Sequence, residues 1–298
     1  MTNATESYDL SLKNNNSHPE TIVIIFCALN APLMLLSIVG NALVLAAILR
    51  TPSLRSPSTV FLCSLAVSDL LVGLVVQPVY VAYELKQVLA LLLVRRPLTF
   101  AAYGVSLCTM AAISVDRLLA LRYHMRYPNL MTTKRAVYTI AILWFTSIFS
   151  MCLGYWDMYI YLSTTVVGVA ICILISTYSY VRIYRIVRHH QLQIHAQQDA
   201  VKSLNTENHL NTVRSTRIAI NTFIFSIVMI LCYSPVFIFT SIYVFSYKGW
   251  KFGSIVVNTS VFLNSAINPL LYCWRLRDLR SAVQKMLRKI LCRETEEN

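Results

Sequence analysis

A single carboxylate, Asp69, stands in a long apolar stretch of the sequence, where it could bind a small cation or a proton. A lone carboxylate in apolar surroundings must be paired or neutralised, because its charge is costly to desolvate. Short hydroxyl and amide residues in other apolar stretches could surround it, namely Ser106, Asn264, Ser265 and Asn268. Either they hold a hydrated cation beside Asp69, or they form an interhelical hydrogen-bond network around a protonated Asp69.

An adjacent acid and base, Asp116 and Arg117, stand at the end of another apolar stretch. The two side chains either snorkel independently to the membrane face or form a latch in which Asp116 holds Arg117 until a conformational change frees it. Pro235 and Pro269 lie inside two further apolar stretches. Each removes a backbone hydrogen bond and kinks its helix, so Pro235 in particular is a natural pivot.

Seven apolar stretches carry these residues, and each is long enough to cross a bilayer as a helix of about 20 residues. They must be helices, since lipid cannot satisfy an open backbone, and their length excludes the strands of a membrane barrel. We predict an all-α fold: a seven-transmembrane helix bundle over residues 21–273, preceded by an extracellular tail (1–20) and followed by a short amphipathic eighth helix and cytoplasmic tail (274–298). The predicted spans are 21–49, 58–84, 90–121, 135–156, 159–187, 213–244 and 251–273.

Composition excludes an ordinary soluble domain. The 298 residues are 56% hydrophobic and 13% charged, whereas soluble domains carry about 25% charged residues. The net charge of +13 could suggest nucleic acid, but most of the 26 lysines and arginines fall between spans on one side of the membrane. The positive-inside rule makes that side cytoplasmic. We therefore expect a multi-pass plasma-membrane protein with its N-terminus outside and no nucleic-acid partner.

Three positions suggest covalent modification. Asn3 and Asn15 begin glycosylation sequons in the N-terminal tail, where the expected orientation would expose them. A third sequon, at Asn258, lies inside the seventh span and is expected to be unused. Cys292 ends the amphipathic stretch and is either palmitoylated or an unmodified interfacial thiol.

The residues that mark the spans resemble, in order, the motifs of the rhodopsin-like (class A) G-protein-coupled receptors, and the resemblance covers nearly the whole chain. Each motif is weak alone, but their order over seven spans is specific. They are Gly40-Asn41, Leu65 with Asp69, Asp116-Arg117, Trp144, Tyr180, Cys232 with Pro235, and Asn268-Pro269-Leu270-Leu271-Tyr272.

This resemblance implies a role for each polar motif. Asp69, Ser106, Asn264, Ser265 and Asn268 would form an allosteric sodium pocket that favours the resting state. Arg117, Tyr180 and Tyr272 would rearrange when the sixth helix swings outward, and Met125 would contact the G protein. Asp116, Tyr233, Pro235 and Pro269 complete the implied activation switch.

Several residues depart from the family pattern. Tyr233 replaces the tryptophan of the sixth-helix toggle, and Cys172 replaces the fifth-helix proline. Leu107 and Met229 replace the isoleucine and phenylalanine that usually couple to that proline. The sixth helix also begins at Ser215, where many members carry an acid that restrains the arginine. We therefore expect elevated basal signalling.

The outer end of the bundle narrows the ligand class. Leu92 replaces the usual disulfide cysteine, and only a few residues join the fourth and fifth spans. With the missing proline, these features resemble the melanocortin, cannabinoid, lysophospholipid and adenosine-like branch. Thr99 replaces the aspartate of amine receptors and Phe262 replaces the retinal lysine of opsins, so a simple monoamine and retinal are not expected.

Arg95-Arg96 lie about 21 residues, or roughly 32 Å of helix, from Arg117 and so at the opposite membrane face. They could bind a carboxylate or phosphate, or they could snorkel to lipid headgroups or pair with Glu84. The implied ligand pocket comprises Arg95, Arg96, Thr99, Tyr103, Tyr233 and Phe262.

The sequence thus predicts a receptor that converts the binding of an extracellular small molecule, lipid or peptide into activation of a heterotrimeric G protein. We expect no enzyme activity, no cofactor besides the sodium ion, and no other metal, because no metal-ligand spacing occurs. An ion-coupled transporter or channel is the alternative, since Asp69 and kinked helices also suit ion coupling. The lack of an internal repeat disfavours it.

Overall fold

The computed structural model describes residues 20–86, 88–123, 125–200, 227–242, 244–245 and 250–296. Every regular element in these ranges is helical. Six helices are long and apolar enough to cross a membrane, and a shorter apolar helix covers Ile227–Ile242 within the sixth predicted span. The predicted all-α bundle is confirmed.

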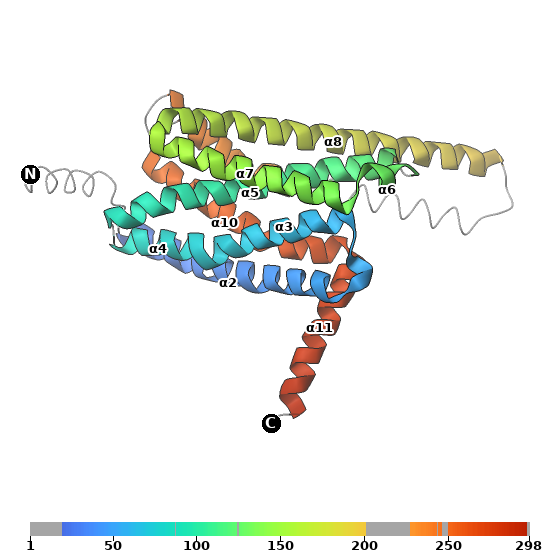
Figure 1. Ribbon diagram of the computed structural model, residues 1–298, viewed down its shortest axis with the longest axis horizontal. Helices are drawn as coiled ribbons and strands as arrows, with labels where there is room; N and C mark the ends of the chain where they lie inside the picture. Colours follow the sequence, from blue (N-terminus) through green and yellow to red (C-terminus); the bar gives the residue numbers. More distant parts are fainter. Residues whose placement is uncertain are drawn as a thin grey trace, which may run out of the picture.

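The helices run back and forth side by side, and α11 turns away from the bundle at one end (Figure 1). Their bounds are α2 (Glu20–Arg50), the 3₁₀ turn η1 (Pro52–Leu54), α3 (Pro57–Leu71), the π-helical turn η2 (Val72–Val76), α4 (Gln77–Lys86), α5 (Leu89–Arg122), α6 (Tyr127–Leu130), α7 (Thr133–Trp156), α8 (Met158–Ala200), α10 (Trp250–Arg275) and α11 (Arg277–Glu296).

The second span is made of α3, η2 and α4 in succession. Ser56 caps its start, because the Ser56 hydroxyl accepts from the Thr59 N–H while the Thr59 hydroxyl accepts from the Ser56 N–H. The π turn then lets the Gln77 N–H reach the Val72 carbonyl, one residue further back than in an α-helix. Pro78, which has no N–H to donate, follows at once. This turn resets which side chains of α4 face the bundle interior.

The fourth and fifth spans are joined by one residue, Asp157, between α7 and α8. Its carboxylate accepts from the backbone N–H groups of Tyr159, at 2.7 Å, and Ile160, at 3.1 Å, and so caps α8. The expected short connection is confirmed. At its other end α8 continues to Ala200, well beyond the predicted end of the fifth span.

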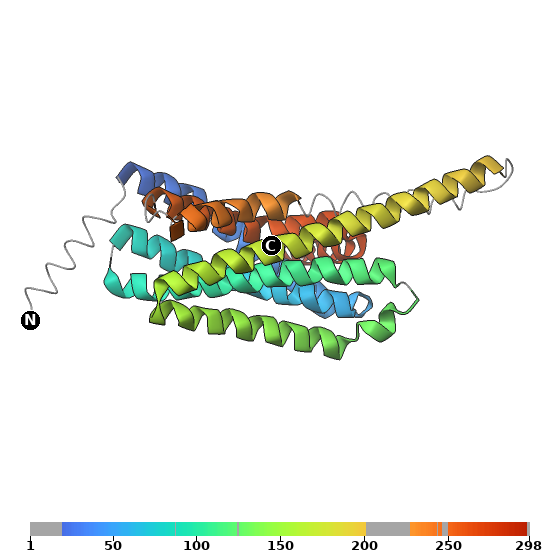
Figure 2. The same ribbon diagram turned by 90° about the horizontal axis from the view of Figure 1, so that it is seen from above.

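Helix α5 occupies the middle of the bundle, in contact with α3, α4, α7 and α8 (Figure 2). Helix α2 packs against α10 and α3. The α2–α10 contact is close at Gly40, where an added Cβ would lie 2.9 Å from the Pro269 ring. A glycine in α2 is therefore what allows the kinked helix α10 to approach.

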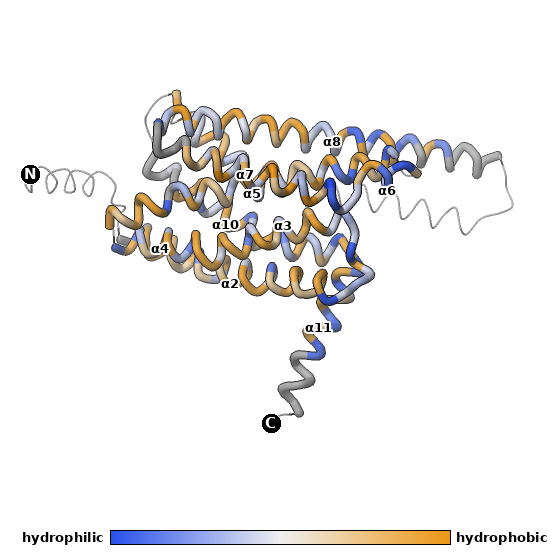
Figure 3. The backbone as a smooth tube through the Cα atoms, in the orientation of Figure 1, coloured by the Kyte–Doolittle hydropathy of each residue, from blue (hydrophilic) through white to orange (hydrophobic). Residues whose placement is uncertain are grey.

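Apolar side chains also cover the outside of the bundle. Phe145 on α7 and Leu174 on α8 are 71% and 68% exposed, and Figure 3 shows hydrophobic residues along most of α7 and along the first part of α8. Hydrophilic residues gather around α6 and at the start of α11. Such an apolar exterior is expected of a surface that faces lipid.

Candidate functional site

Asp69 lies at the centre of the bundle and is fully buried. Its Oδ1 accepts hydrogen bonds from the hydroxyls of Ser265, at 2.8 Å, and Ser106, at 3.2 Å. Its Oδ2 accepts from Asn268 Nδ2 at 2.8 Å. Helices α3, α5 and α10 each contribute to this cluster. Because all three partners donate, Asp69 acts purely as an acceptor, as an ionised carboxylate does.

Residues around Asp69 extend the network to α2. Ser37 donates to the backbone carbonyl of Asp69 at 2.9 Å, and Asn41 donates to the carbonyls of Ser37 and Ser265. The hydroxyls of Ser68 and Ser106 lie 3.1 Å apart. Ser37 was not identified from the sequence as part of this network. Ser37 precedes Asn41 by one helical turn, so the two side chains lie on the same face of the helix.

Asn264 departs from the predicted sodium pocket. Its Nδ2 points to the Tyr233 hydroxyl at 3.3 Å and to the Met110 sulfur at 3.7 Å, and no hydrogen bond joins it to Asp69 within the described residues. It sits one residue before Ser265, which on a helix turns its side chain about 100° away. Within the described residues, Asn264 therefore contacts Tyr233 and Met110 and makes no hydrogen bond to the Asp69 cluster.

The Asp69 cluster has the chemistry that a hard cation requires. The side-chain oxygens of Asn41 and Asn268 are buried and have no hydrogen-bond partner within the described residues. Together with the Asp69 carboxylate and two serine hydroxyls, they form a purely oxygen-based donor set. These residues fit the sodium ion that the sequence predicts.

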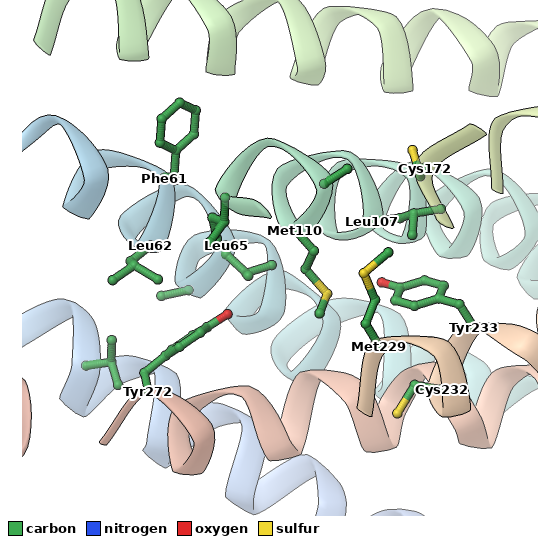
Figure 4. Close-up of a cluster of buried hydrophobic side chains, with 14 of the residues drawn as sticks. Phe61, Leu62, Leu65, Leu107, Met110, Cys172, Met229, Cys232, Tyr233 and Tyr272 are labelled. Atoms are coloured by element: carbon green, nitrogen blue, oxygen red, sulfur yellow. The ribbon is translucent and has the colours of Figure 1, made fainter. Parts of the chain in front are cut away.

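Tyr233 lies beside the residues that depart from the family pattern. Figure 4 shows its ring next to Leu107 and Met229, with Cys172 close to Leu107. All four are buried members of one apolar cluster. Met110, also fully buried, lies between this group and Tyr272. Flexible methionine side chains fill the space between the two tyrosines of the predicted switch.

Of the two alternatives for Asp116 and Arg117, the structure does not show the latch in which Asp116 holds Arg117. Its two carboxylate oxygens accept hydrogen bonds from Ser58 on α3 and Tyr127 on α6, both at 2.7 Å. The Ser58 and Tyr127 hydroxyls lie 2.9 Å apart. Asp116 and Arg117 form no ion pair within the described residues, because successive helical side chains diverge. Sequence reasoning missed Ser58 and Tyr127 as partners.

Burial of Tyr127 raises the pKa of its phenol, and the neighbouring carboxylate of Asp116 raises it further. A raised pKa means that folding favours the protonated hydroxyl. This contribution to stability is complete below the ordinary tyrosine pKa and is lost only as the pH rises through the higher folded value. Tyr127 therefore remains a hydrogen-bond donor to Asp116 throughout the physiological range.

The other predicted switch residues lie at the same end of the bundle or along its axis. The Arg117 Nε is buried and has no hydrogen-bond partner within the described residues. Tyr180 accepts a 2.8 Å hydrogen bond from Ser114 on α5, and Tyr272 is 1% exposed. Met125 is 86% exposed and available for contact. Pro235 lies inside the helix Ile227–Ile242 and Pro269 inside α10.

Arg95, at the other end of the bundle, is held by Glu84 on α4. The guanidinium lies 2.8 Å from the Glu84 carboxylate, and its Cζ sits 4.5 Å and 4.1 Å from the ring centroids of Tyr80 and Tyr83. The sequence left open whether Arg95 binds an anionic ligand, snorkels to lipid headgroups or pairs with Glu84. In the structure Arg95 is paired with Glu84. The side chain of Arg96 lies outside the described residues.

Several of the remaining predicted pocket residues form a buried polar cluster near Arg95. Tyr103 donates to Asn258 Oδ1 at 2.7 Å, Asn258 donates to the Tyr80 hydroxyl at 3.2 Å, and Tyr80 packs edge-on against Phe262. The third sequon is thus buried and hydrogen-bonded, which agrees with its predicted lack of use. Thr99 is buried nearby, and its hydroxyl has no partner within the described residues.

A cavity of about 230 Å³ lies among α5, α7, α8 and the helix Ile227–Ile242. Tyr103 and Tyr233 line it, whereas Arg95, Thr99 and Phe262 do not. Its walls also include Phe100, Tyr161 and Thr165, which the sequence did not single out. The predicted single pocket therefore corresponds to a cavity on one side of Tyr103 and a buried polar cluster on the other.

Some predicted positions lie outside the described residues. These are Asn3, Asn15 and Ser215, and the side chain of Cys292.

Comparison with known families agrees with this geometry. The model of the 7 transmembrane receptor (rhodopsin family) matches residues 40–155 and 148–272. The matched region includes the Asp69 cluster, the Asp116-Arg117 pair and Tyr272, so it spans the centre of the bundle and the end at which Asp116 and Arg117 lie. The chain therefore belongs to the rhodopsin family of seven-transmembrane receptors.

Proposed function

We propose that this receptor converts the binding of an extracellular ligand into activation of a heterotrimeric G protein, with its N-terminus outside the cell. The observation that carries the proposal is the arrangement at the inner end of α5. Both carboxylate oxygens of Asp116 accept hydrogen bonds from Ser58 and Tyr127, so Asp116 does not hold the Arg117 side chain. An arginine that forms no ion pair within the described residues is suited to contact a partner protein or to exchange hydrogen bonds between tyrosines.

The proposed switch consists of Arg117, Tyr180 and Tyr272 around a cytoplasmic cleft that opens when the helix of Pro235 moves. Ser114 holds Tyr180 in the present arrangement, and Tyr272 is packed in the core. Both would need new partners after the movement. A ligand drives this change only as far as it binds the open arrangement more tightly.

The proposed sodium ion would be held by Asp69, Ser106, Ser265 and Asn268, whose side chains meet at the centre of the bundle. When bound, the ion supplies a positive charge that ties α3, α5 and α10 together. The alternative, a hydrogen-bond network with no ion, uses the same side chains. Measuring whether basal nucleotide exchange depends on sodium distinguishes a bound ion from an ion-free hydrogen-bond network.

The extracellular ligand is proposed to enter the cavity lined by Tyr103 and Tyr233. To contact Arg95, Arg96, Thr99 or Phe262 as well, it would have to extend past Tyr103, because none of them is among the described residues that line the cavity. The cavity approaches the ~300 Å³ of small drug-sized sites. An anionic group would have to compete with Glu84 for Arg95. This favours a ligand whose apolar body, rather than its charge, supplies most of the affinity.

Nucleotide exchange on a purified Gα subunit tests the proposal. We expect Arg117→Ala to lower agonist-independent exchange about tenfold, since hydrogen bonds to charged groups contribute about 1.5–3 kcal/mol. Arg122→Ala, at the exposed end of the same helix, is the matched control and should resemble the parent. Tyr127→Phe should raise basal exchange, because it removes one of the two donors that fix Asp116.

If the parent released no GDP from any Gα subunit and Arg117→Ala behaved like the parent, the proposal would be wrong. Ion-driven substrate flux in liposomes would then support the transporter alternative.

A further inference from the structure

Two cysteines from different helices face each other in the cavity lined by Tyr103 and Tyr233. The Sγ atoms of Cys108 on α5 and Cys172 on α8 lie 4.0 Å apart, and both residues line this cavity of about 230 Å³. Both thiols are free. Among the described residues, no other two cysteine sulfurs are in hydrogen-bond contact. The pair is therefore a dithiol that joins two walls of one cavity.

Open space lies beside the two sulfurs. Gly168 precedes Cys172 by four residues, so both lie on the same face of α8, and Gly168 also lines the cavity. A Cβ added at Gly168 would meet nothing within 4 Å. A disulfide bond is about 2.05 Å long, so the sulfurs would have to approach each other by about 2 Å. A change of one χ1 well displaces a sulfur by roughly 3 Å, so this gap is within the range of side-chain rotation.

The surroundings of the dithiol favour redox chemistry over metal binding. A metal site of protein ligands needs more than two thiols, and no three His, Cys, Asp or Glu side chains lie together in the described part of the chain. A hydrogen bond between thiols is weak and contributes little by itself. What two adjacent thiols can do is exchange their hydrogens for a bond to each other when an oxidant is present.

The cavity selects the kind of oxidant. No charged side chain is among the described residues that line it, so a neutral oxidant is favoured over an ionic one. One water occupies about 30 Å³, so hydrogen peroxide, which is only slightly larger, fits easily. Cys108 is partly exposed whereas Cys172 is 8% exposed. Cys108 is therefore the sulfur that an entering peroxide meets first.

We propose that Cys108 and Cys172 form a reversible disulfide when hydrogen peroxide enters the cavity. The Cys108 sulfur attacks one peroxide oxygen: an S–O bond forms, the O–O bond breaks, and the thiol proton leaves with the other oxygen as water. The Cys172 sulfur then attacks the resulting sulfenic sulfur: an S–S bond forms, the S–O bond breaks, and the second thiol proton leaves with that oxygen as a second water. Two electrons pass from the sulfurs to the peroxide.

The disulfide ties α5 to α8 in the wall of the cavity. It joins residues that are 64 positions apart, so it restricts the unfolded chain and stabilises the folded receptor. It also prevents the two walls from separating, and so limits entry of the extracellular ligand. That last consequence rests on the proposed function, whereas the bond itself is measured without an agonist or a G protein.

Peroxide treatment of the purified full-length receptor, in nanodiscs that each hold one receptor, tests the proposal. We expect a pair of peptides joined through Cys108 and Cys172, which dithiothreitol separates. The melting temperature should rise by roughly 5 °C on oxidation and return on reduction. Oxidation of the exposed Met125 to its sulfoxide shows that the dose was sufficient.

Variants separate the two thiols. Cys172→Ser should abolish the joined peptides and the rise in melting temperature, and should leave Cys108 as a sulfenic acid that dimedone traps. Cys108→Ser should also abolish the bond, but with much less dimedone adduct, because Cys172 is the more buried thiol. Cys63→Ser is the matched control, since Cys63 is likewise a partly exposed thiol within a span. It should respond to peroxide as the parent does.

The proposal is overturned if no joined peptides form at doses that oxidise Met125, or if Cys108 pairs with another cysteine. An equal rise in melting temperature in Cys172→Ser would also overturn it. If the serine variants do not fold, the joined peptides of the parent and their separation by dithiothreitol decide the question. A receptor that forms the bond but activates no Gα subunit would contradict only the proposed function.

Discussion

Arg95 and Glu84 form an ion pair that is almost entirely removed from water. Their side chains are 12% and 4% exposed, and two tyrosine rings cover the guanidinium. Desolvating two charges is costly, so a buried pair contributes little net stability, but losing one partner leaves an uncompensated charge. The same pairing changes how Arg95 can act on ligands, because its charge is already balanced.

We expect Arg95→Met alone to destabilise the receptor by about 3–5 kcal/mol, because it strands the Glu84 carboxylate. The double variant Arg95→Met with Glu84→Met should regain most of that loss. Thermal unfolding of the purified receptor measures both. Arg122→Met, at an exposed arginine stacked on Tyr123, should change little. Equal stability of the single and double variants would contradict a buried pair.

At the scale of the element, proline and glycine decide how the helices meet. The π turn before Pro78 changes the face that α4 presents, and so allows Tyr80 and Glu84 to be buried while Lys86 stays exposed. Pro269 of α10 packs closely against α2 at Gly40. These contacts hold the Asp69 cluster in place, since Asn268 is adjacent to Pro269 and Asn41 to Gly40.

Gly40→Val should therefore destabilise the receptor by about 1–3 kcal/mol, as overpacking of a tight core does. The added Cβ would meet the Pro269 ring at 2.9 Å, and neither backbone can move without disturbing Asn41 and Asn268. Gly168→Ala on α8 is the control, because an added Cβ there meets nothing within 4 Å; it should be neutral or stabilising. A Gly40→Val receptor with the parent's melting temperature would show that the contact is not tight.

At the scale of the whole molecule, the Asp69 network joins four helices. Ser37 and Asn41 on α2, Asp69 on α3, Ser106 on α5 and the serine and asparagine of α10 are linked through hydrogen bonds shorter than about 3.2 Å. A change at any of these helices must alter the network. Under the proposed function, the network is therefore placed to couple ligand binding at one end of the bundle to the switch at the other.

If the network holds sodium, replacing potassium with sodium at constant ionic strength should lower basal nucleotide exchange of the parent. Asp69→Asn should abolish this response, because it removes the charge but keeps a side chain of the same shape. Ser68→Ala, which removes a neighbouring hydroxyl that does not contact the carboxylate, should retain it. A parent that is indifferent to sodium would leave the hydrogen-bond network as the role of these residues.

The sequence by itself determined the membrane-spanning bundle and the family, because span length, hydropathy and the order of motifs are properties of local segments. Through resemblance to a known family it also grouped Asp69, Ser106, Asn264, Ser265 and Asn268 in one cluster, and all of these except Asn264 are hydrogen-bonded together. The structure brings these residues together from three helices, although Asp69 and Asn268 are 199 positions apart in the sequence.

Only the tertiary structure decided which partner each polar group has. Asp116 is held by Ser58 and Tyr127, Arg95 is paired with Glu84, and Asn264 points to Tyr233. These pairings depend on how each helix is rotated about its axis and how closely its neighbours pack. A rotation of one residue, about 100°, changes every partner while leaving the hydropathy of the span the same.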